Sequence, residues 1–201
     1  MPEVLVPVAR LVRWVENFGG RHGRPVLTAV DGGLRGSAED GSWFTARLPF
    51  DRAYDGAPDA ASFAGAVTAP DHWGVLLVRK GGFAVARLAG ERVEESKVGQ
   101  RHVQGRTKAG GQSQQRFARR RDNQARDAYR AAADHAARIL DGVELVVTGG
   151  DRSAVAEVLA DPRLGRLRVA GRWLAVPDPR RAVLEAAISD ALAVRVEVEN
   201  V

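Results

Sequence analysis

Apolar residues recur at three- and four-residue steps along several parts of the chain, a spacing typical of amphipathic helices. The longest such pattern begins near Gln114 and stops before Asp141-Gly142, a pair that predicts the end of a helix. Asp59 is a suitable N-cap for a shorter helix. In chain order, the predicted helices cover residues 5–18, 59–68, 114–140, 153–159 and 180–193.

Short runs rich in Val, Leu and aromatic residues lie between glycine turns and predict strands. The run that starts at Trp43 alternates and is expected to pair with the strand before it, with a turn at 36–41 between them. Lys80-Gly81-Gly82 predicts a hairpin turn. Strands that alternate with helices in the second half imply a mixed α/β layer. The predicted strands cover residues 25–30, 43–48, 74–78, 83–88, 92–98, 143–148 and 167–176, the last as a strand or a bent hairpin.

A domain boundary is expected between residues 55 and 71, a segment rich in Ala, Gly and Asp that contains Pro58 and Pro70. A length of 201 residues fits one large domain or two small ones. We therefore predict a small N-terminal α+β segment of unknown role over residues 1–70. Residues 71–201 are predicted to form the second domain.

The polar positions include a strongly basic stretch from Lys97 to Arg121, KVGQRHVQGRTKAGGQSQQRFARRR. It contains eight Lys or Arg residues and no Asp or Glu. The whole chain carries +5, so +5 less +8 leaves −3 for all other residues. A concentrated basic patch on a near-neutral body is typical of a face that binds phosphates, and we expect its ligand to be a polyanion.

The composition excludes several kinds of catalytic and metal site. The chain has no cysteine, which excludes disulfides, thiolate nucleophiles and iron–sulfur clusters. Its four histidines are scattered, without a metal-ligand spacing, so no metal site is expected. No apolar run approaches the ~20 residues that a membrane helix needs, and the N-terminus does not resemble a signal peptide. We expect a cytoplasmic protein that needs no cofactor.

Gly110-Gly111-Gln112 lies in the middle of the basic stretch. Neither glycine has a Cβ, so the backbone N–H of Gln112 can approach a ligand very closely. The run from Gly110 to Arg121, GGQSQQRFARRR, resembles the central domain of eukaryotic and archaeal class I release factors, in which GGQ-Ser is followed by Arg-Phe-Ala-Arg and a long helix. The resemblance covers about residues 73–201 and implies a ribonuclease-H-like mixed sheet flanked by helices.

Two departures refine the resemblance. The segment before residue 73 is shorter than a stop-codon-reading domain and has no NIKS-type motif, and no segment after residue 201 is expected to recruit a GTPase. The chain is therefore more similar to the Vms-like release factor (VLRF) family, in its bacterial and actinobacterial branch. That family keeps the glutamine-bearing loop and lacks decoding.

The resemblance implies a codon-independent peptidyl-tRNA hydrolase that acts on stalled ribosomes or large subunits. Gln112 is the implied catalytic residue, and Gly110 and Gly111 shape its loop. The implied partners are the large ribosomal subunit with its 23S rRNA and peptidyl-tRNA, and a monomer without membrane contact is expected. By register, Arg101 matches an arginine that is important in the family. The residues expected to contact RNA are Arg101, His102, Arg106, Lys108, Ser113, Arg116, Arg119, Arg120 and Arg121.

Two other functions remain open from the residues alone: a non-catalytic module of the same fold that binds RNA or the ribosome, and a nuclease that cleaves the 3′ end of tRNA. Few carboxylates lie near the loop to hold Mg²⁺ for a nuclease. Gly149-Gly150-Asp151 follows a strand but lacks the spacing of a phosphate loop, so a turn and helix cap is expected there. His135 is expected to serve packing or to lie on the surface.

Overall fold

The computed structural model describes the backbone of residues 2–100 and 112–201 and the side chains of 2–99 and 126–201. The chain forms two compact units, one of Met1–Ala69 with Ser189–Val201 and the other of Pro70–Ile188. Each unit contains one five-stranded sheet. The units are described one at a time below.

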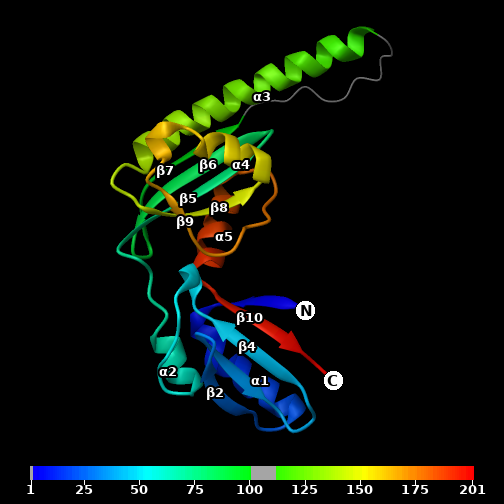
Figure 1. The fold of residues 1–201 in the computed structure, drawn as a ribbon, viewed down its shortest axis with the longest axis vertical. Coiled ribbons are helices and arrows are strands. Elements are labelled where there is room, and N and C mark those ends of the chain that lie inside the picture. Colours follow the sequence, from blue (N-terminus) through cyan, green and yellow to red (C-terminus); the bar gives the residue numbers. More distant parts are fainter. Residues whose placement is uncertain (1, 101–111) are drawn as a thin grey trace. The chain divides into compact units, whose positions relative to one another are not determined.

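The sheet of the first unit is antiparallel throughout, in the order β1-β10-β4-β3-β2. Figure 1 shows the strand from the C-terminal end of the chain, in red, between strands from the N-terminal end. The elements of this unit are β1 (Glu3–Val6), the 3-10 helix η1 (Val8–Arg10), α1 (Leu11–His22), β2 (Val26–Val30), β3 (Gly33–Ser37), β4 (Trp43–Arg47), η2 (Pro49–Asp51), α2 (Ala60–Gly65) and β10 (Val194–Glu199).

The core of the first unit lies between this sheet and its helices. Leu11 of α1, Phe44 of β4 and Phe63 of α2 are fully buried in one cluster. Asp59 caps α2 as predicted, because its side chain accepts a hydrogen bond from the Ser62 amide.

The structure corrects three expectations for this unit. The helix predicted over residues 5–18 begins only after Pro7, and the segment before it is strand β1. The predicted turn at 36–41 begins inside strand β3. β4 pairs with β3 and β10 instead of β2, because a two-residue turn at Asp31 and Gly32, with φ of 51° and 70°, folds β3 back onto β2.

The end of the chain also departs from the expected domains. Residues 194–201 were expected to lie with the second domain, but β10 pairs with β1 and β4 in the first sheet. The segment alternates as VRVEVE, and its Val194 and Val196 fill the core of the first unit. Burial of these two valines explains why the strand belongs there.

The second unit contains a mixed sheet in the order β7-β6-β5-β8-β9. β5, β6 and β7 form an antiparallel meander, whereas β8 and β9 run parallel to β5. This confirms the mixed α/β, ribonuclease-H-like sheet expected from the sequence. The elements are β5 (His72–Arg79), β6 (Gly82–Ala89), β7 (Arg92–Gln100), α3 (Gln112–Ile139), β8 (Leu145–Gly150), α4 (Arg152–Leu159), η3 (Pro162–Leu164), β9 (Arg168–Val169) and α5 (Arg181–Leu192), whose last turn belongs to the first unit.

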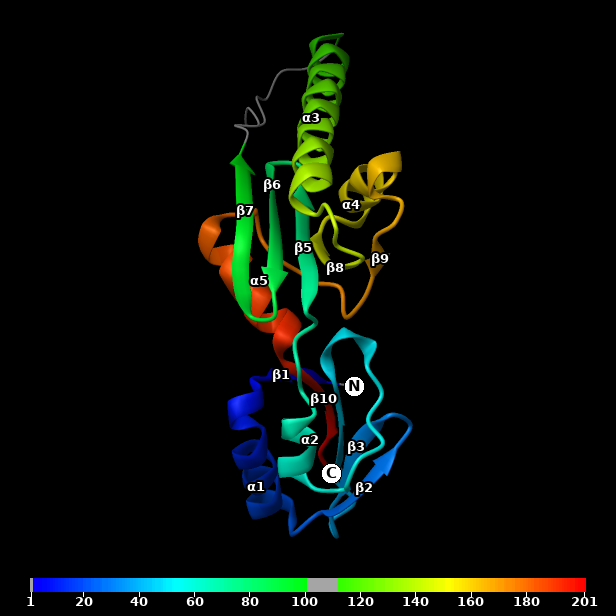
Figure 2. The ribbon, with the colours of Figure 1, turned by 90° about the vertical axis from the view of Figure 1, so that its left-hand side faces the viewer.

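Helices cover both faces of this sheet. α3 and α4 pack on the face that carries Leu76 and Val78, and α5 lies on the other side (Figure 2). Val75 and Leu77, which point to that other side, are also fully buried. The central strand β5 is therefore apolar on both faces, which explains its uninterrupted hydrophobic sequence.

Candidate functional site

The predicted catalytic loop lies in sequence between the end of β7 and the start of α3. Gln112 is the first residue of α3, so the helix begins two residues earlier than the sequence pattern predicts. Ser113, Arg116, Arg119, Arg120 and Arg121 follow in its first three turns. The other predicted site residues lie outside the described residues: Arg101, His102, Arg106, Lys108, Gly110 and Gly111.

α3 is long enough to hold Gln112 well away from the sheet. The helix has 28 residues, and its first turns run past the end of the sheet (Figures 1 and 2). Ala128 is the first buried residue among its described side chains. At about 1.5 Å per residue, Gln112 begins the helix roughly 24 Å before Ala128. The first backbone N–H groups of a helix have no partner within it and carry a partial positive charge.

The other half of α3 is fixed to the sheet. Ala132, Ala136 and Ile139 are fully buried in the core of the second unit. Arg138 donates a hydrogen bond of 2.6 Å to a carboxylate oxygen of Glu95 on β7. The half of α3 that contains these residues is therefore packed against the sheet.

The strand that leads into the loop is tied to the same helix. Gly99, next to last in β7, is opposite Phe83 of β6. The buried ring of Phe83 lies over Gly99 and stacks on His135 of α3, with ring centroids 5.4 Å apart. The packing role expected for His135 therefore holds, and the end of β7 is tied to the anchored half of α3.

Gly149-Gly150-Asp151 forms a helix cap, as the sequence predicts. The Asp151 carboxylate accepts hydrogen bonds from the Ser153 amide at 3.1 Å and the Ser153 hydroxyl at 2.8 Å, at the start of α4. These hydrogen bonds hold the pKa of Asp151 below its usual value. Gly150 has a φ of 103°, and a Cβ there would overlap the Val78 carbonyl.

In the part of the chain that the structure describes, no three His, Asp or Glu side chains are grouped to hold a metal ion. None of the helices described is both long and apolar enough to cross a bilayer.

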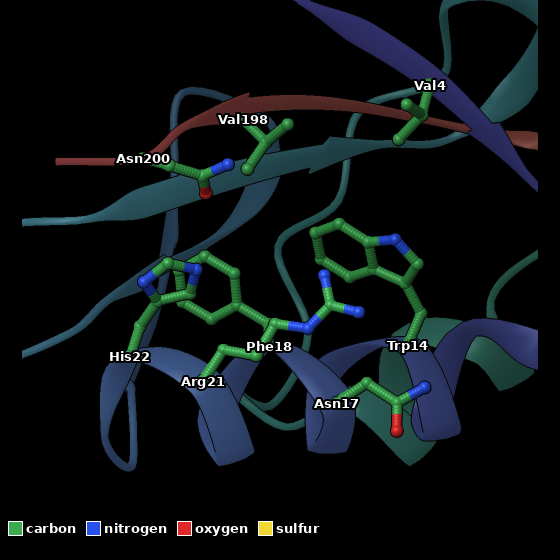
Figure 3. A pocket seen from close by; sticks show the side chains of 8 residues that line it. All are labelled: Val4, Trp14, Asn17, Phe18, Arg21, His22, Val198 and Asn200. Carbon is green, nitrogen blue, oxygen red and sulfur yellow. The ribbon is translucent and has the colours of Figure 1, made fainter.

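A cavity of about 260 Å³ opens in the first unit between α1 and the strands β1 and β10 (Figure 3). Trp14 and Phe18 stack in its wall with centroids 5.9 Å apart, and Nδ1 of His22 lies 2.9 Å from Asp40. The cavity is smaller than the roughly 300–1,000 Å³ typical of small-molecule sites. The lining residues are Val4, Trp14, Asn17, Phe18, Arg21, His22, Val198 and Asn200.

No expectation from the sequence concerned this cavity, although the sequence contains one signal for it. Trp14, Phe18 and His22 recur at four-residue steps, which places three rings on one face of α1. The opposite wall comes from β10, near the other end of the chain, and no local pattern connects it with α1.

Known proteins resemble this chain to different extents. No curated protein matches it. Among solved structures, the crystal structure of an archaeal translation termination factor, aRF1, is 13% identical with a TM-score of 0.42, and a further archaeal protein is 11% identical with a TM-score of 0.38. Each match covers 94% of this chain, which spans 63% and 65% of the two proteins.

The family comparison covers most of the second unit and part of β10. The model of the actinobacteria/chloroflexi VLRF1 release factors matches residues 71–197, which is more than half of the chain. The matched range includes the loop, all of α3 and the mixed sheet. The chain therefore belongs to the actinobacterial and chloroflexi VLRF1 release-factor family.

Proposed function

We propose that this protein hydrolyses peptidyl-tRNA and releases nascent chains from stalled ribosomes or large subunits without reading a codon. Membership of a release-factor family supports a role of this kind. The observation that carries the proposal further is the position of Gln112 at the first residue of a long helix whose other end is fixed in the core.

The proposed reaction is an ester hydrolysis. The oxygen of a water molecule attacks the carbonyl carbon that joins the peptide to the terminal ribose of the tRNA. The bond between that carbon and the ribose oxygen breaks, and a proton from the water passes to the ribose oxygen. The products are a tRNA with a free terminal hydroxyl and a peptide with a free carboxylic acid, which releases the second proton of the water to solvent at neutral pH.

Gln112 acts by position and hydrogen bonding in this proposal. An amide does not titrate near neutral pH, so Gln112 is not a general base. Its backbone N–H is suited to the negative charge that develops on the ester oxygens, and its side-chain amide is suited to orienting the water. The position at the start of the helix favours the interaction with the negative charge, because the helix dipole is positive there.

The proposed partners are the large subunit with its 23S rRNA and the peptidyl-tRNA. The cations of the loop and of the first turns of α3 would contact RNA phosphates, each adding a salt-dependent part of the affinity. We propose Arg101, His102, Arg106, Lys108, Ser113, Arg116, Arg119, Arg120 and Arg121 for this role, with Gly110 and Gly111 shaping the loop.

The test is release of a labelled nascent chain from a ribosome complex stalled without a stop codon. We expect wild-type protein to convert peptidyl-tRNA to free peptide, and Gln112→Ala to lower the rate about 100-fold, because it keeps the backbone N–H but removes the side-chain amide that orients the water. Gln114→Ala is the matched control, because it removes the same side chain from the same helical turn. Cosedimentation with ribosomes checks that all three proteins bind equally.

Three outcomes separate the candidate functions. Equal release by wild-type and Gln112→Ala protein would contradict the catalytic role of the glutamine. Binding without any release by wild-type protein would make the chain a non-catalytic ribosome-binding module. A released peptide that still carries nucleotides would indicate cleavage of the tRNA 3′ end.

A further inference from the structure

One end of the second sheet brings together three segments that are distant in sequence. Strand register places Gln100 opposite Gly82 and Gly82 opposite Arg79, while Val78 is opposite Gly150. This is the end at which β7 leads into the predicted catalytic loop, and the parallel strands β5 and β8 both finish there. In α/β sheets, ligands bind beyond the carboxyl ends of the parallel strands.

Arg152 and Trp173 form a stacked pair at this end. The guanidinium carbon of Arg152, the first residue of α4, lies 4.5 Å from the centroid of the Trp173 ring. Trp173 is half-buried and packs on the core of the unit. The next residue, Leu174, forms a parallel bridge to Gly149 of β8, which fixes the backbone beneath the ring. Arg152 is exposed, so its guanidinium rests on a fixed aromatic surface.

No carboxylate neutralises Arg152 among the described side chains. The neighbouring Asp151 is hydrogen-bonded to Ser153 as the cap of α4 instead. Lys80 is exposed in the turn between β5 and β6, and it lies close enough to contribute to the lowered pKa of Asp151. In the described part of the chain, Lys80 makes no salt bridge, so two cations face solvent at this end of the sheet.

A flat cation held on an aromatic ring, with a second cation nearby, matches the chemistry of an unpaired nucleic acid strand. Unstacked bases bind to aromatic rings or to guanidinium planes, and nearby cations contact the phosphates. An acidic protein segment would use the charges but would gain nothing from the flat surface. The stacked geometry therefore favours RNA over an acidic peptide.

We propose that Lys80, Arg152 and Trp173 form a platform that binds unpaired RNA at the end of the sheet where β5, β7 and β8 finish. Arg152 stacks on a base, Lys80 contacts a phosphate, and Trp173 is a positioning residue that holds the guanidinium. The identification of this RNA as part of the ribosome or of its tRNA rests on the proposed function, whereas the binding itself does not.

The test uses the full chain and a labelled single-stranded RNA of about 12 nucleotides, within the site sizes of single-strand binding proteins, with affinity measured by fluorescence anisotropy. Arg152→Gln should weaken binding roughly tenfold, within the range found for one stacked base. Lys80→Gln should weaken binding roughly eightfold at about 50 mM salt and reduce the slope of log affinity against log salt by about 0.7, the value for one phosphate contact on a single strand. Arg152→Lys should weaken binding without changing the slope, because an ammonium keeps the charge but does not stack.

A double-mutant comparison tests the role of Trp173. Trp173→Leu should lower the RNA affinity and leave the salt slope unchanged. Trp173→Phe should lower the affinity less, because a phenyl ring still supports the guanidinium. In the Trp173→Leu background, Arg152→Lys should have no further effect, because the ring no longer holds the guanidinium. A purely structural role for Trp173 would leave the effect of Arg152→Lys intact.

Arg92→Gln is the matched control, because Arg92 is 73% exposed at the opposite end of β7 and the variant loses the same charge. RNA that carries 4-thiouridine should cross-link to the tryptic peptide of residues 173–180. Equal effects of Arg152→Gln and Arg92→Gln in folded proteins would overturn the proposal. Binding of a labelled polyglutamate peptide with the same dependence on Arg152 would overturn it in favour of an acidic protein partner.

Failure of this proposal can be told apart from failure of the proposed function. Gln112→Ala should bind the RNA as wild-type protein does. If wild-type protein releases no nascent chain but Arg152→Gln still loses RNA affinity, only the hydrolase proposal fails. If release depends on Gln112 while the platform variants bind RNA normally, only the platform fails.

Discussion

The ring of Phe83 lies over Gly99 on the neighbouring strand, where a Cβ would overlap its edge. Gly99 is next to last in β7, the edge strand that precedes the predicted catalytic loop. A glycine weakens a strand because it has no side chain to pack, and an aromatic ring from the next strand supplies the missing contact. The first sheet repeats the arrangement, with Phe44 over Gly36.

Gly99→Ala should destabilise the second unit by about 1–3 kcal/mol, the usual cost of an extra methyl group in a packed site. The methyl would displace the Phe83 ring and, with it, the stack on His135. Urea denaturation measures the loss, and amide hydrogen exchange of β6 and β7 assigns it to this unit. Adding Phe83→Leu to Gly99→Ala should recover part of the lost stability, because the leucine side chain leaves room for the new methyl group.

Gly20→Ala is the control for this substitution. Gly20 lies inside α1, and nothing comes within 4 Å of the position of a Cβ. Alanine there should stabilise the first unit by about 0.5–1 kcal/mol, because it favours the helix over the unfolded chain. A loss of stability from Gly20→Ala would contradict the open space around this glycine.

Asp151→Ala should destabilise α4 by about 1 kcal/mol, the usual effect of removing an N-cap. Asp151→Asn should keep most of the stability, because asparagine caps as well as aspartate does. Wild-type protein and Asp151→Asn should differ in their acid response. The pKa of Asp151 is lowered in the folded protein, so its contribution is complete above the unfolded pKa and disappears as the pH falls through the folded value.

Wild-type protein should therefore lose this part of its stability in acid, whereas Asp151→Asn should not. Urea denaturation at neutral pH and at low pH compares the two. An identical acid response in both proteins would show that the Asp151 charge takes no part in the cap.

The Asp161 carboxyl should titrate far below its usual range. Hydrogen bonds from the Arg163 side chain and amide lower its pKa to about 2. Because the folded pKa is depressed, the stabilisation from this pair is present above the unfolded value, about 3.9, and is lost as the pH falls toward 2. A carboxyl NMR titration measures the pKa, and Arg163→Gln should raise it toward the ordinary value. An unchanged pKa in the variant would exclude the arginine as the cause.

Removal of residues 194–201 should unfold the first unit and leave the second intact. β10 lies between β1 and β4, so its loss leaves both strands without a partner on that side and empties the core of Val194 and Val196. Amide exchange should become fast in β1–β4 and stay slow in β5, β6 and β8. Removal of only the last two residues, which follow β10, should have little effect.

Periodicity predicted most helices and strands but not their long-range pairing. The apolar faces of α3 and α4 could be read locally because each is buried by its own unit. Strand β3 was missed because its two glycines suggest a turn, and only the ring of Phe44 from β4 makes Gly36 suitable for a strand. The placement of β10 depends on a partner almost 200 residues away, which no local pattern reveals.

The candidate site was predicted unevenly for the same reason. Gln112 was found from a short motif, and the structure adds its position at the start of α3. Arg152 and Trp173 were not recognised as a pair, because they are separated by a loop, a 3-10 helix and strand β9. Only the bridge between β8 and Leu174 brings them together.

The return of the chain to the first sheet has a consequence for biosynthesis. Translation proceeds from the N-terminus, so β1 to β4 leave the ribosome long before β10, whereas every strand of the second sheet is made in one continuous stretch. Domains fold as units while they emerge, so the second unit should fold first. The first sheet then stays incomplete until β10 is made, and a chain that ends before residue 194 would carry a folded second unit next to an incomplete first unit.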